Sequence, residues 1–163
     1  MIKNTDEYWL DLAYRHASIE SFDPSTQNAA VIVLNGCILS TGVNSLPSGV
    51  ERIPDRLQRP VKYQWTEHAE RNAIYRAASC GIKVRGATMY CPWAPCAECA
   101  RAIIQSGIRE LVGHDASMHA TRPDWAESLA IAIQMMEEAG VIFRKVHGQF
   151  GVPVRFNGQM VQV

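Results

Sequence analysis

The second half of the chain alternates between segments with helical spacing and short apolar runs. Apolar residues repeat at helical intervals in three segments, each followed directly by a glycine that can end a helix: residues 68–80, 95–106 and 123–139. The short runs between and after them occupy residues 87–91, 111–114 and 141–146. Helices that alternate with strands connect parallel strands and cover both faces of the sheet. The second half therefore predicts an α/β fold.

The first half contains a helix and a hairpin. Residues 5–18 have helical spacing, and two strands, 29–34 and 37–41, are joined by an Asn-Gly turn. Residues 42–66 are rich in glycine, proline and charge and predict a long loop, which in a compact domain is usually functional. A second Asn-Gly pair predicts a small terminal hairpin within residues 154–163.

Length and charge limit the classes of protein. The 163 residues suit a single domain, residues 1–163, around one hydrophobic core. Lysine plus arginine balance aspartate plus glutamate at 16 each, and nucleic-acid-binding proteins carry clustered positive charge, so we expect no stable nucleic-acid partner. No apolar run approaches the roughly 20 residues that span a bilayer, and the polar N-terminus lacks a secretory signal. We expect a cytoplasmic protein that does not associate with membranes.

The chain has five cysteines, an odd number that indicates reduced thiols or metal ligands and not a disulfide framework. Cys96 and Cys99 are three residues apart at the start of a predicted helix, so their thiols can share a metal ion. Cys91 lies within a predicted strand. We expect Cys37 and Cys80 to be small core residues.

Two motifs, His-Ala-Glu at residues 68–70 and Pro-Cys-Ala-Glu-Cys at residues 95–99, each begin a predicted helix. Zinc prefers thiolate and imidazole ligands, and a helix N-terminus favours the thiolate. We therefore expect His68, Cys96 and Cys99 to bind Zn²⁺. Three protein ligands leave the fourth position open to water, as in catalytic zinc sites. Glu70 lies two residues after His68, where it can move protons without binding the metal.

The site has other interpretations. A Cys-x-x-Cys pair alone is more typical of a structural zinc clip or a redox pair. Cys91 could supply a fourth ligand, and such a closed site would indicate a zinc-stabilised binding module. The ordered combination of His68, Glu70 and the two cysteines is instead the signature of zinc deaminases. In these enzymes hydroxide attacks C4 of a cytosine ring, and the glutamate acts as general acid and base.

Beyond this signature, the sequence resembles the deoxycytidylate (dCMP) deaminase family of the cytidine deaminase superfamily over almost its whole length. The blocks that carry the resemblance are residues 23–27, 42–49, 68–74, 95–100, 104–108 and 139–145. The resemblance implies a three-layer α/β/α fold with a five-stranded mixed sheet. It also implies hydrolysis of dCMP to dUMP and ammonia, with Glu70 as the proton shuttle. The resemblance further implies that the chain forms a homo-oligomer, either a dimer or a hexamer.

The resemblance also implies substrate contacts: Asn44 hydrogen-bonds the sugar, and the Ala69 backbone helps hold the base. Some family members bind a second zinc through Cys and His in the loop before the helix that begins with the His-Ala-Glu motif. Residues 50–66 contain neither Cys nor His, so we expect one zinc per chain. Asn44 could alternatively serve only to form a turn.

The phosphate of such a substrate needs a cationic or amide-rich pocket. Thr26 and Gln27 in the loop before the first strand, and His119 and Arg122 after residues 111–114, are the residues that we expect there. Arg122 could equally be a solvated surface charge. The zinc chemistry also fits dCTP, a 5-modified dCMP or a free base or nucleoside such as guanine, and, less well, RNA or single-stranded DNA editing.

Overall fold

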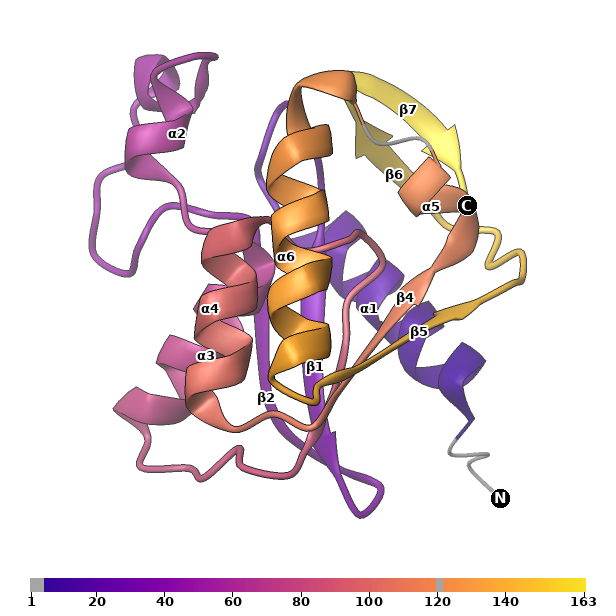
Figure 1. The fold of residues 1–163 in the computed structure, drawn as a ribbon. Coiled ribbons are helices and arrows are strands. Elements are labelled where there is room, and N and C mark those ends of the chain that lie inside the picture. The colour runs from indigo at the N-terminus through magenta and orange to yellow at the C-terminus, as the bar shows by residue number, and fades with distance from the viewer. Residues whose placement is uncertain (1–4, 120–121) are drawn as a thin grey trace.

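The computed structural model describes residues 5–119 and 122–163 and contains a mixed five-stranded sheet in the order β2-β1-β3-β4-β5 (Figure 1). β1 pairs antiparallel with both β2 and β3, whereas β3, β4 and β5 are parallel. The strands are β1 (Ala29–Leu34), β2 (Cys37–Val43), β3 (Thr88–Tyr90), β4 (Glu110–His114) and β5 (Ile142–Val146). The parallel half corresponds to the alternating half of the sequence, as predicted.

Helices cover both faces of this sheet, which confirms the three-layer α/β/α fold. One face packs against α3 (Ala69–Ser79), α4 (Ala97–Ser106) and α6 (Ala126–Glu138), and the other packs against α1 (Asp6–Glu20) (Figure 1). Alternation along β1 explains both contacts. Ile32 and Ala30 belong to the core under α3, α4 and α6, while Val31 and Val33 belong to the core under α1.

Both Asn-Gly pairs form the predicted hairpin turns. Asn35 and Asn157 have φ of 51° and 50°, and the following glycines have φ of 73° and 83°. The second turn joins β6 (Pro153–Phe156) to β7 (Gln159–Gln162), a two-stranded sheet that packs against α1 through Val154 and Tyr14 (Figure 1). The C-terminal end of the chain therefore returns to the first helix.

The segment predicted as a loop, residues 42–66, contains two short helices. They are the 3-10 helix η1 (Pro54–Leu57) and α2 (Lys62–Trp65). Burial of Lys62 against Asp23 fixes the second helix, and this contact spans 39 residues of sequence, so local patterning did not predict it.

Two further differences follow β4. The described part of the chain has a short helix, α5 (Asp115–His119), that the sequence pattern did not predict. The helix predicted to begin at residue 123 begins as a 3-10 turn, η2 (Pro123–Trp125), before α6. No helix in residues 5–119 or 122–163 is both long and apolar enough to span a membrane.

Gly42 positions α3 on the sheet. A Cβ atom on Gly42 would lie 2.2 Å from the backbone N of Ala73 and 2.5 Å from the backbone O of Ala69. Only glycine permits this approach of strand β2 to the first turns of α3. The N-terminus of α3, where the His-Ala-Glu motif lies, is thereby held close to the sheet.

Candidate active site

The three predicted metal ligands lie together where the N-termini of two helices meet. His68 is the N-cap residue of α3, Cys96 is the N-cap residue of α4, and Cys99 lies in the first turn of α4. Nδ1 of His68 is 3.5 Å from Sγ of both cysteines, and the three ligand atoms all lie within 4.8 Å of one another. Two sulfurs and one imidazole nitrogen at this spacing suit tetrahedral zinc.

Electrostatics favour the thiolate form of one of these ligands, Cys96. The pKa of Cys96 is lowered to about 3, foremost because the Cys99 thiol donates a hydrogen bond to it, and His68 adds to the effect. The partial positive charge at the N-terminus of α4 acts in the same direction. The site therefore presents a thiolate, the form in which cysteine binds zinc.

The remaining cysteines stay outside this group. In the part of the chain that the structure describes, no second group of three His, Cys, Asp or Glu side chains comes together in this way. Cys91 is buried, and its Sγ accepts a hydrogen bond from Asn28 Nδ2 at 3.2 Å. Burial also raises the pKa of Cys91 and keeps it a thiol. Cys37 and Cys80 are exposed, so their prediction as core residues was wrong.

An ionic clamp joins the two helices that carry the ligands. Arg71 on α3 donates from Nε to Glu67 at 2.5 Å and from Nη1 to Glu98 on α4 at 2.6 Å. Ser128 on α6 accepts a hydrogen bond from the backbone N of Ala97 at 3.0 Å, and so satisfies one free N–H at the start of α4. These contacts fix the relative position of the ligands.

A pocket opens beside the cluster, and His68, Glu70 and Cys96 are among the residues that line it. The side chain of Glu70 is buried, and its Oε2 has no hydrogen-bond partner in the described structure. Burial raises the pKa of Glu70, because a buried carboxylate loses its hydration. A carboxyl group with a raised pKa beside a metal site is suited to exchanging protons near neutral pH.

Asn44 and Ala69, the predicted sugar and base contacts, bond to each other. Oδ1 of Asn44 accepts from the backbone N of Ala69 at 3.0 Å, and its Nδ2 donates to the backbone O of Thr26 at 2.9 Å. Asn44 and Thr26 line the pocket. The Thr26 hydroxyl oxygen accepts from the backbone N of Asn157 at 3.5 Å, which links the pocket to the terminal hairpin.

The other residues predicted to bind phosphate differ in their placement. Arg122 lines the pocket; it pairs with Asp124 through one nitrogen, and its buried Nη1 has no partner in the described structure. Gln27 does not line the pocket, because its amide binds backbone groups of Ser18, Ser21 and Arg155. His119 ends helix α5, and its side chain lies outside the described structure.

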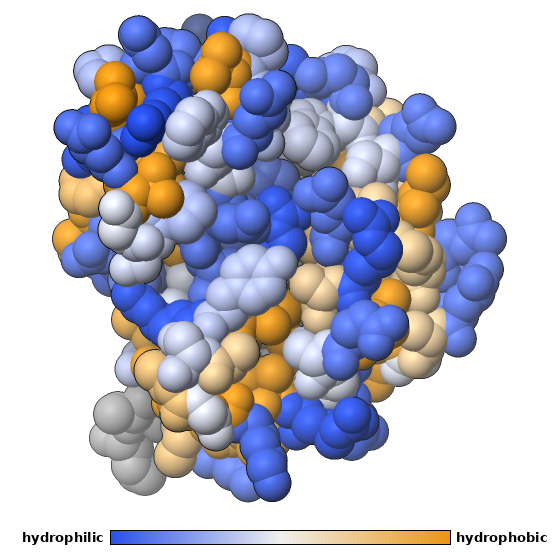
Figure 2. Space-filling view, turned by 90° about the vertical axis from the view of Figure 1, so that its left-hand side faces the viewer, coloured by the Kyte–Doolittle hydropathy of each residue, from blue (hydrophilic) through white to orange (hydrophobic). Residues whose placement is uncertain are grey.

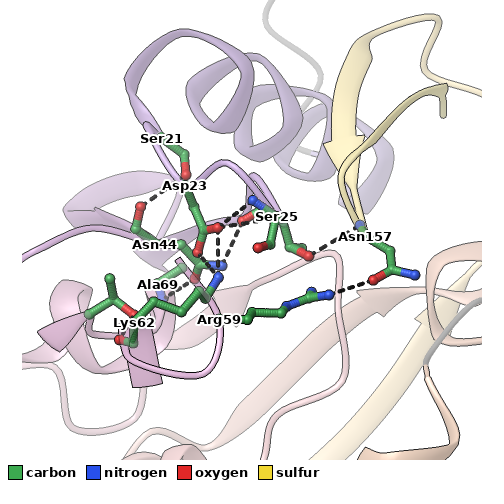
Figure 3. A network of polar contacts seen from close by, with 10 residues as sticks. Ser21, Asp23, Ser25, Asn44, Arg59, Lys62, Ala69 and Asn157 are labelled. Atoms are coloured by element: carbon green, nitrogen blue, oxygen red, sulfur yellow. Dashed lines mark hydrogen bonds and ion pairs between the residues drawn. The ribbon is translucent and has the colours of Figure 1, made fainter. Parts of the chain in front are cut away.

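The sequence analysis did not identify the network of polar side chains around Asp23, Lys62 and Arg59 (Figure 3). Lys62 Nζ lies 2.6 and 2.5 Å from the two carboxylate oxygens of Asp23, and both side chains are buried. Arg59 reaches across to Asn157 Oδ1 at 2.7 Å. Asp23, Arg59 and Lys62 all line the pocket. Their positions depend on the long loop, for which no motif signals a partner.

Aromatic side chains form the pocket walls, and these too were not predicted. Trp93 stacks on Phe156 of the terminal hairpin with 4.4 Å between ring centroids. Trp125 lies 5.7 Å from the His68 ring and 5.9 Å from the Tyr63 ring. All of these residues line the pocket. The closeness of Trp93 to Cys96 in sequence was the one available signal.

Unsatisfied polar atoms concentrate in this pocket. In the described chain, four buried side-chain nitrogen and oxygen atoms lack a hydrogen-bond partner: Asn28 Oδ1, Glu70 Oε2, Trp93 Nε1 and Arg122 Nη1. All four residues line the pocket. Buried polar atoms are usually paired, so a cluster of unpaired ones marks a place where a polar ligand binds.

Comparisons with known proteins agree with this site. Residues 3–114 match the family model for the cytidine and deoxycytidylate deaminase zinc-binding region. Deoxycytidylate deaminase of Homo sapiens is 36% identical over 146 residues, which cover 85% of this chain and 78% of that protein. The enzyme of enterobacteria phage T4 is 32% identical over 160 residues, covering 74% and 82%.

A solved structure has the same fold. The dCMP deaminase of cyanophage S-TIM5, crystallised in complex with dCMP and dUMP, superimposes with a TM-score of 0.65 at 22% identity and covers 90% of this chain and 99% of that one. The family model spans both zinc motifs of this chain. The chain therefore belongs to the zinc-binding cytidine and deoxycytidylate deaminase family of hydrolytic enzymes.

Proposed function

We propose that this protein hydrolyses the amino group of dCMP to give dUMP and ammonia. The observation that carries the proposal is the composition of one pocket. Glu70 lines this pocket together with His68 and Cys96 of the metal-ligand cluster, and the cations Arg59, Lys62 and Arg122 line the same pocket. A base that reacts beside the metal ligands and an anionic phosphate that pairs with the cations fit such a lining.

Glu70 is the group that transfers protons. Glu70 lines the pocket, its buried Oε2 has no hydrogen-bond partner in the described structure, and burial raises the pKa of its carboxyl group above the ordinary value. It takes a proton from the attacking water, delivers it to N3 of the ring, and assists protonation of the departing amine. The C4–O bond forms and the C4–N bond breaks, so that water and dCMP become dUMP and ammonia.

His68, Cys96 and Cys99 hold the metal in this scheme. When bound there, zinc supplies the Lewis acid that makes water nucleophilic at neutral pH. The two helix N-termini and the ion pairs of Arg71 hold the three ligand atoms in fixed relative positions. The walls formed by Trp93, with Phe156, and by Trp125 limit the access of bulk water to the base.

The residues proposed to bind phosphate combine predicted and newly identified ones. The buried Nη1 of Arg122 has no partner in the described structure, and Thr26 lines the same pocket. In the described structure, the side chain of Arg59 makes one hydrogen bond, to the neutral amide of Asn157. The positive charge of Arg59 is therefore available to an anion. Lys62 is neutralised by Asp23 and holds the wall in place. The roles proposed for Gln27 and His119 have no contact in the described structure that supports them.

Three wider properties accompany this proposal. The pocket draws on residues from Asp23 to Phe156, which supports a chain that works as one domain. Exposed hydrophobic side chains, among them Tyr63, Tyr75 and Ile82, support a homo-oligomer. Figure 2 shows hydrophobic residues interspersed with hydrophilic ones on one side of the molecule. Thiols that must stay reduced to bind zinc support a cytoplasmic location.

Ammonia release from a nucleotide panel tests the proposal. We expect the highest kcat/KM with dCMP, compared with cytosine, deoxycytidine, CMP, dCTP and 5-methyl-dCMP. Arg122→Ala is expected to raise KM for dCMP much more than KM for deoxycytidine, because only dCMP carries the phosphate. Equal effects on the two substrates would remove Arg122 from phosphate binding, and no release from any cytosine compound would reject the function.

A further inference from the structure

Asn28 is the one buried amide of the pocket whose side chain has a free hydrogen-bond acceptor in the described structure. It lies immediately before β1, is 5% exposed and lines the pocket with Glu70. Its Oδ1 has no partner, whereas the Asn44 amide uses both of its polar atoms within the protein. No role follows for Asn28 from the zinc motifs.

Its neighbours hold the Asn28 side chain in one orientation. Nδ2 donates to Sγ of Cys91 at 3.2 Å, and Cys91 is a buried thiol at the end of β3. The backbone O of Asn28 accepts from the backbone N of Asn44 at 3.0 Å. Nδ2 uses one of its two N–H donors on Cys91, and Oδ1 is the acceptor that the described structure leaves for a ligand.

Two unpartnered acceptors therefore belong to described residues that line this pocket, Asn28 Oδ1 and Glu70 Oε2. A buried acceptor without a donor is unfavourable, so a ligand that supplies N–H groups is favoured there. Cytosine carries its N–H donors on the amino group at C4, the reacting position. Uracil has an acceptor oxygen at that position instead.

We propose that Asn28 Oδ1 accepts a hydrogen bond from the amino group that is removed, and so selects the amino form of the base over the keto form. This inference rests on the proposed function. The contact persists as the amino group takes up a proton and departs as ammonia, since the nitrogen keeps its N–H bonds. In the product, O4 of dUMP takes the place of the amino group. Two acceptors, this O4 and Asn28 Oδ1, then face each other, which favours release of dUMP.

Substitution of Asn28 by leucine tests this role, because leucine has a similar branched shape and no acceptor. The measurements are kcat/KM for dCMP, from ammonia release, and the competitive Ki for dUMP. We expect kcat/KM to fall about 10- to 100-fold, which corresponds to leaving one buried donor unpaired. We expect Ki for dUMP to stay the same or to decrease.

Asn72→Leu is the matched control, because this amide lies on α3 and bonds Val43 and Ser45 outside the pocket. It is expected to change kcat/KM and Ki together, in step with any loss of folded protein. Asn28→Ala replaces the leucine variant if leucine prevents folding, and the same shift in the ratio of the two constants is expected.

An unchanged ratio of dCMP turnover to dUMP inhibition in the Asn28 variants would overturn this inference while leaving the deaminase function intact. Weaker dUMP binding in proportion to the loss of dCMP turnover would also overturn it, because Asn28 would then support the pocket as a whole. Absence of dCMP turnover in the wild-type protein would reject both the function and the inference.

Discussion

Oδ1 of Asn44 accepts a hydrogen bond from the backbone N–H of Ala69 at 3.0 Å. This bond joins the loop after β2 to the first residue of α3, between His68 and Glu70. The family resemblance implies that both groups contact the substrate, which stays a prediction. In the structure they satisfy each other, so substrate binding would exchange one buried hydrogen bond for another.

Asn44→Ala is therefore expected to affect both stability and substrate binding. It removes two buried hydrogen bonds, to Ala69 and to Thr26, and we expect the free energy of unfolding to fall by about 1–3 kcal/mol. KM for dCMP is expected to rise. Urea denaturation and steady-state kinetics measure the two effects, and an unchanged KM would confine Asn44 to a turn-forming role.

Cys96→Ala is expected to abolish stoichiometric zinc binding and to lower the melting temperature, since a bound metal stabilises the folded state. Cys80→Ala is the control, because Cys80 is exposed and lies outside the cluster. Metal analysis and thermal unfolding check both variants. Retention of one zinc per chain by Cys96→Ala would contradict its assignment as a ligand.

Lys62→Met is expected to lower the free energy of unfolding by about 3–5 kcal/mol, because it leaves the buried Asp23 carboxylate without its counter-charge. The double variant Asp23→Asn/Lys62→Met is expected to recover part of this loss. Urea denaturation of the two single variants and the double variant forms the necessary cycle. Independent, additive effects would show that the two residues do not stabilise each other.

Asp6 provides a pH-dependent prediction away from the pocket. Hydrogen bonds from Arg144 lower the pKa of Asp6 below its ordinary value of 3.8, so ionised Asp6 stabilises the link between α1 and β5. This contribution is complete above the unfolded pKa and disappears as the pH falls through the lower folded pKa. At pH 6 the melting temperature of the wild-type protein is expected to exceed that of Asp6→Asn. This difference in melting temperature is expected to disappear in acid. A gap that persists at all pH values would contradict the ion pair.

Local signals in the sequence predicted much of the fold. The Asn35–Gly36 turn fixed the first hairpin, and strand β1 has the predicted bounds. Helices α3 and α4 begin at the two zinc motifs, whose residues include the metal ligands. Glycines with positive φ follow the C-terminal ends of both helices. The three ligands come together as predicted.

Other parts of the pocket lining could not be predicted in this way. Asp23 pairs with Lys62 across 39 residues, and Phe156 reaches Trp93 from the terminal hairpin. Such contacts depend on packing between distant elements, and no local pattern in the sequence pairs these residues. The role predicted for Gln27 stays a prediction; in the structure its amide hydrogen-bonds backbone groups of Ser21 and Arg155.

The most direct test of the account is the rate of ammonia release from dCMP by Glu70→Gln protein that carries one zinc per chain. Glutamine keeps the shape of the side chain but cannot exchange protons as a carboxyl group does. We predict a loss of at least about 10²- to 10⁴-fold relative to wild type, the usual contribution of general acid–base catalysis. A zinc-loaded variant with a rate close to that of wild type would contradict the account.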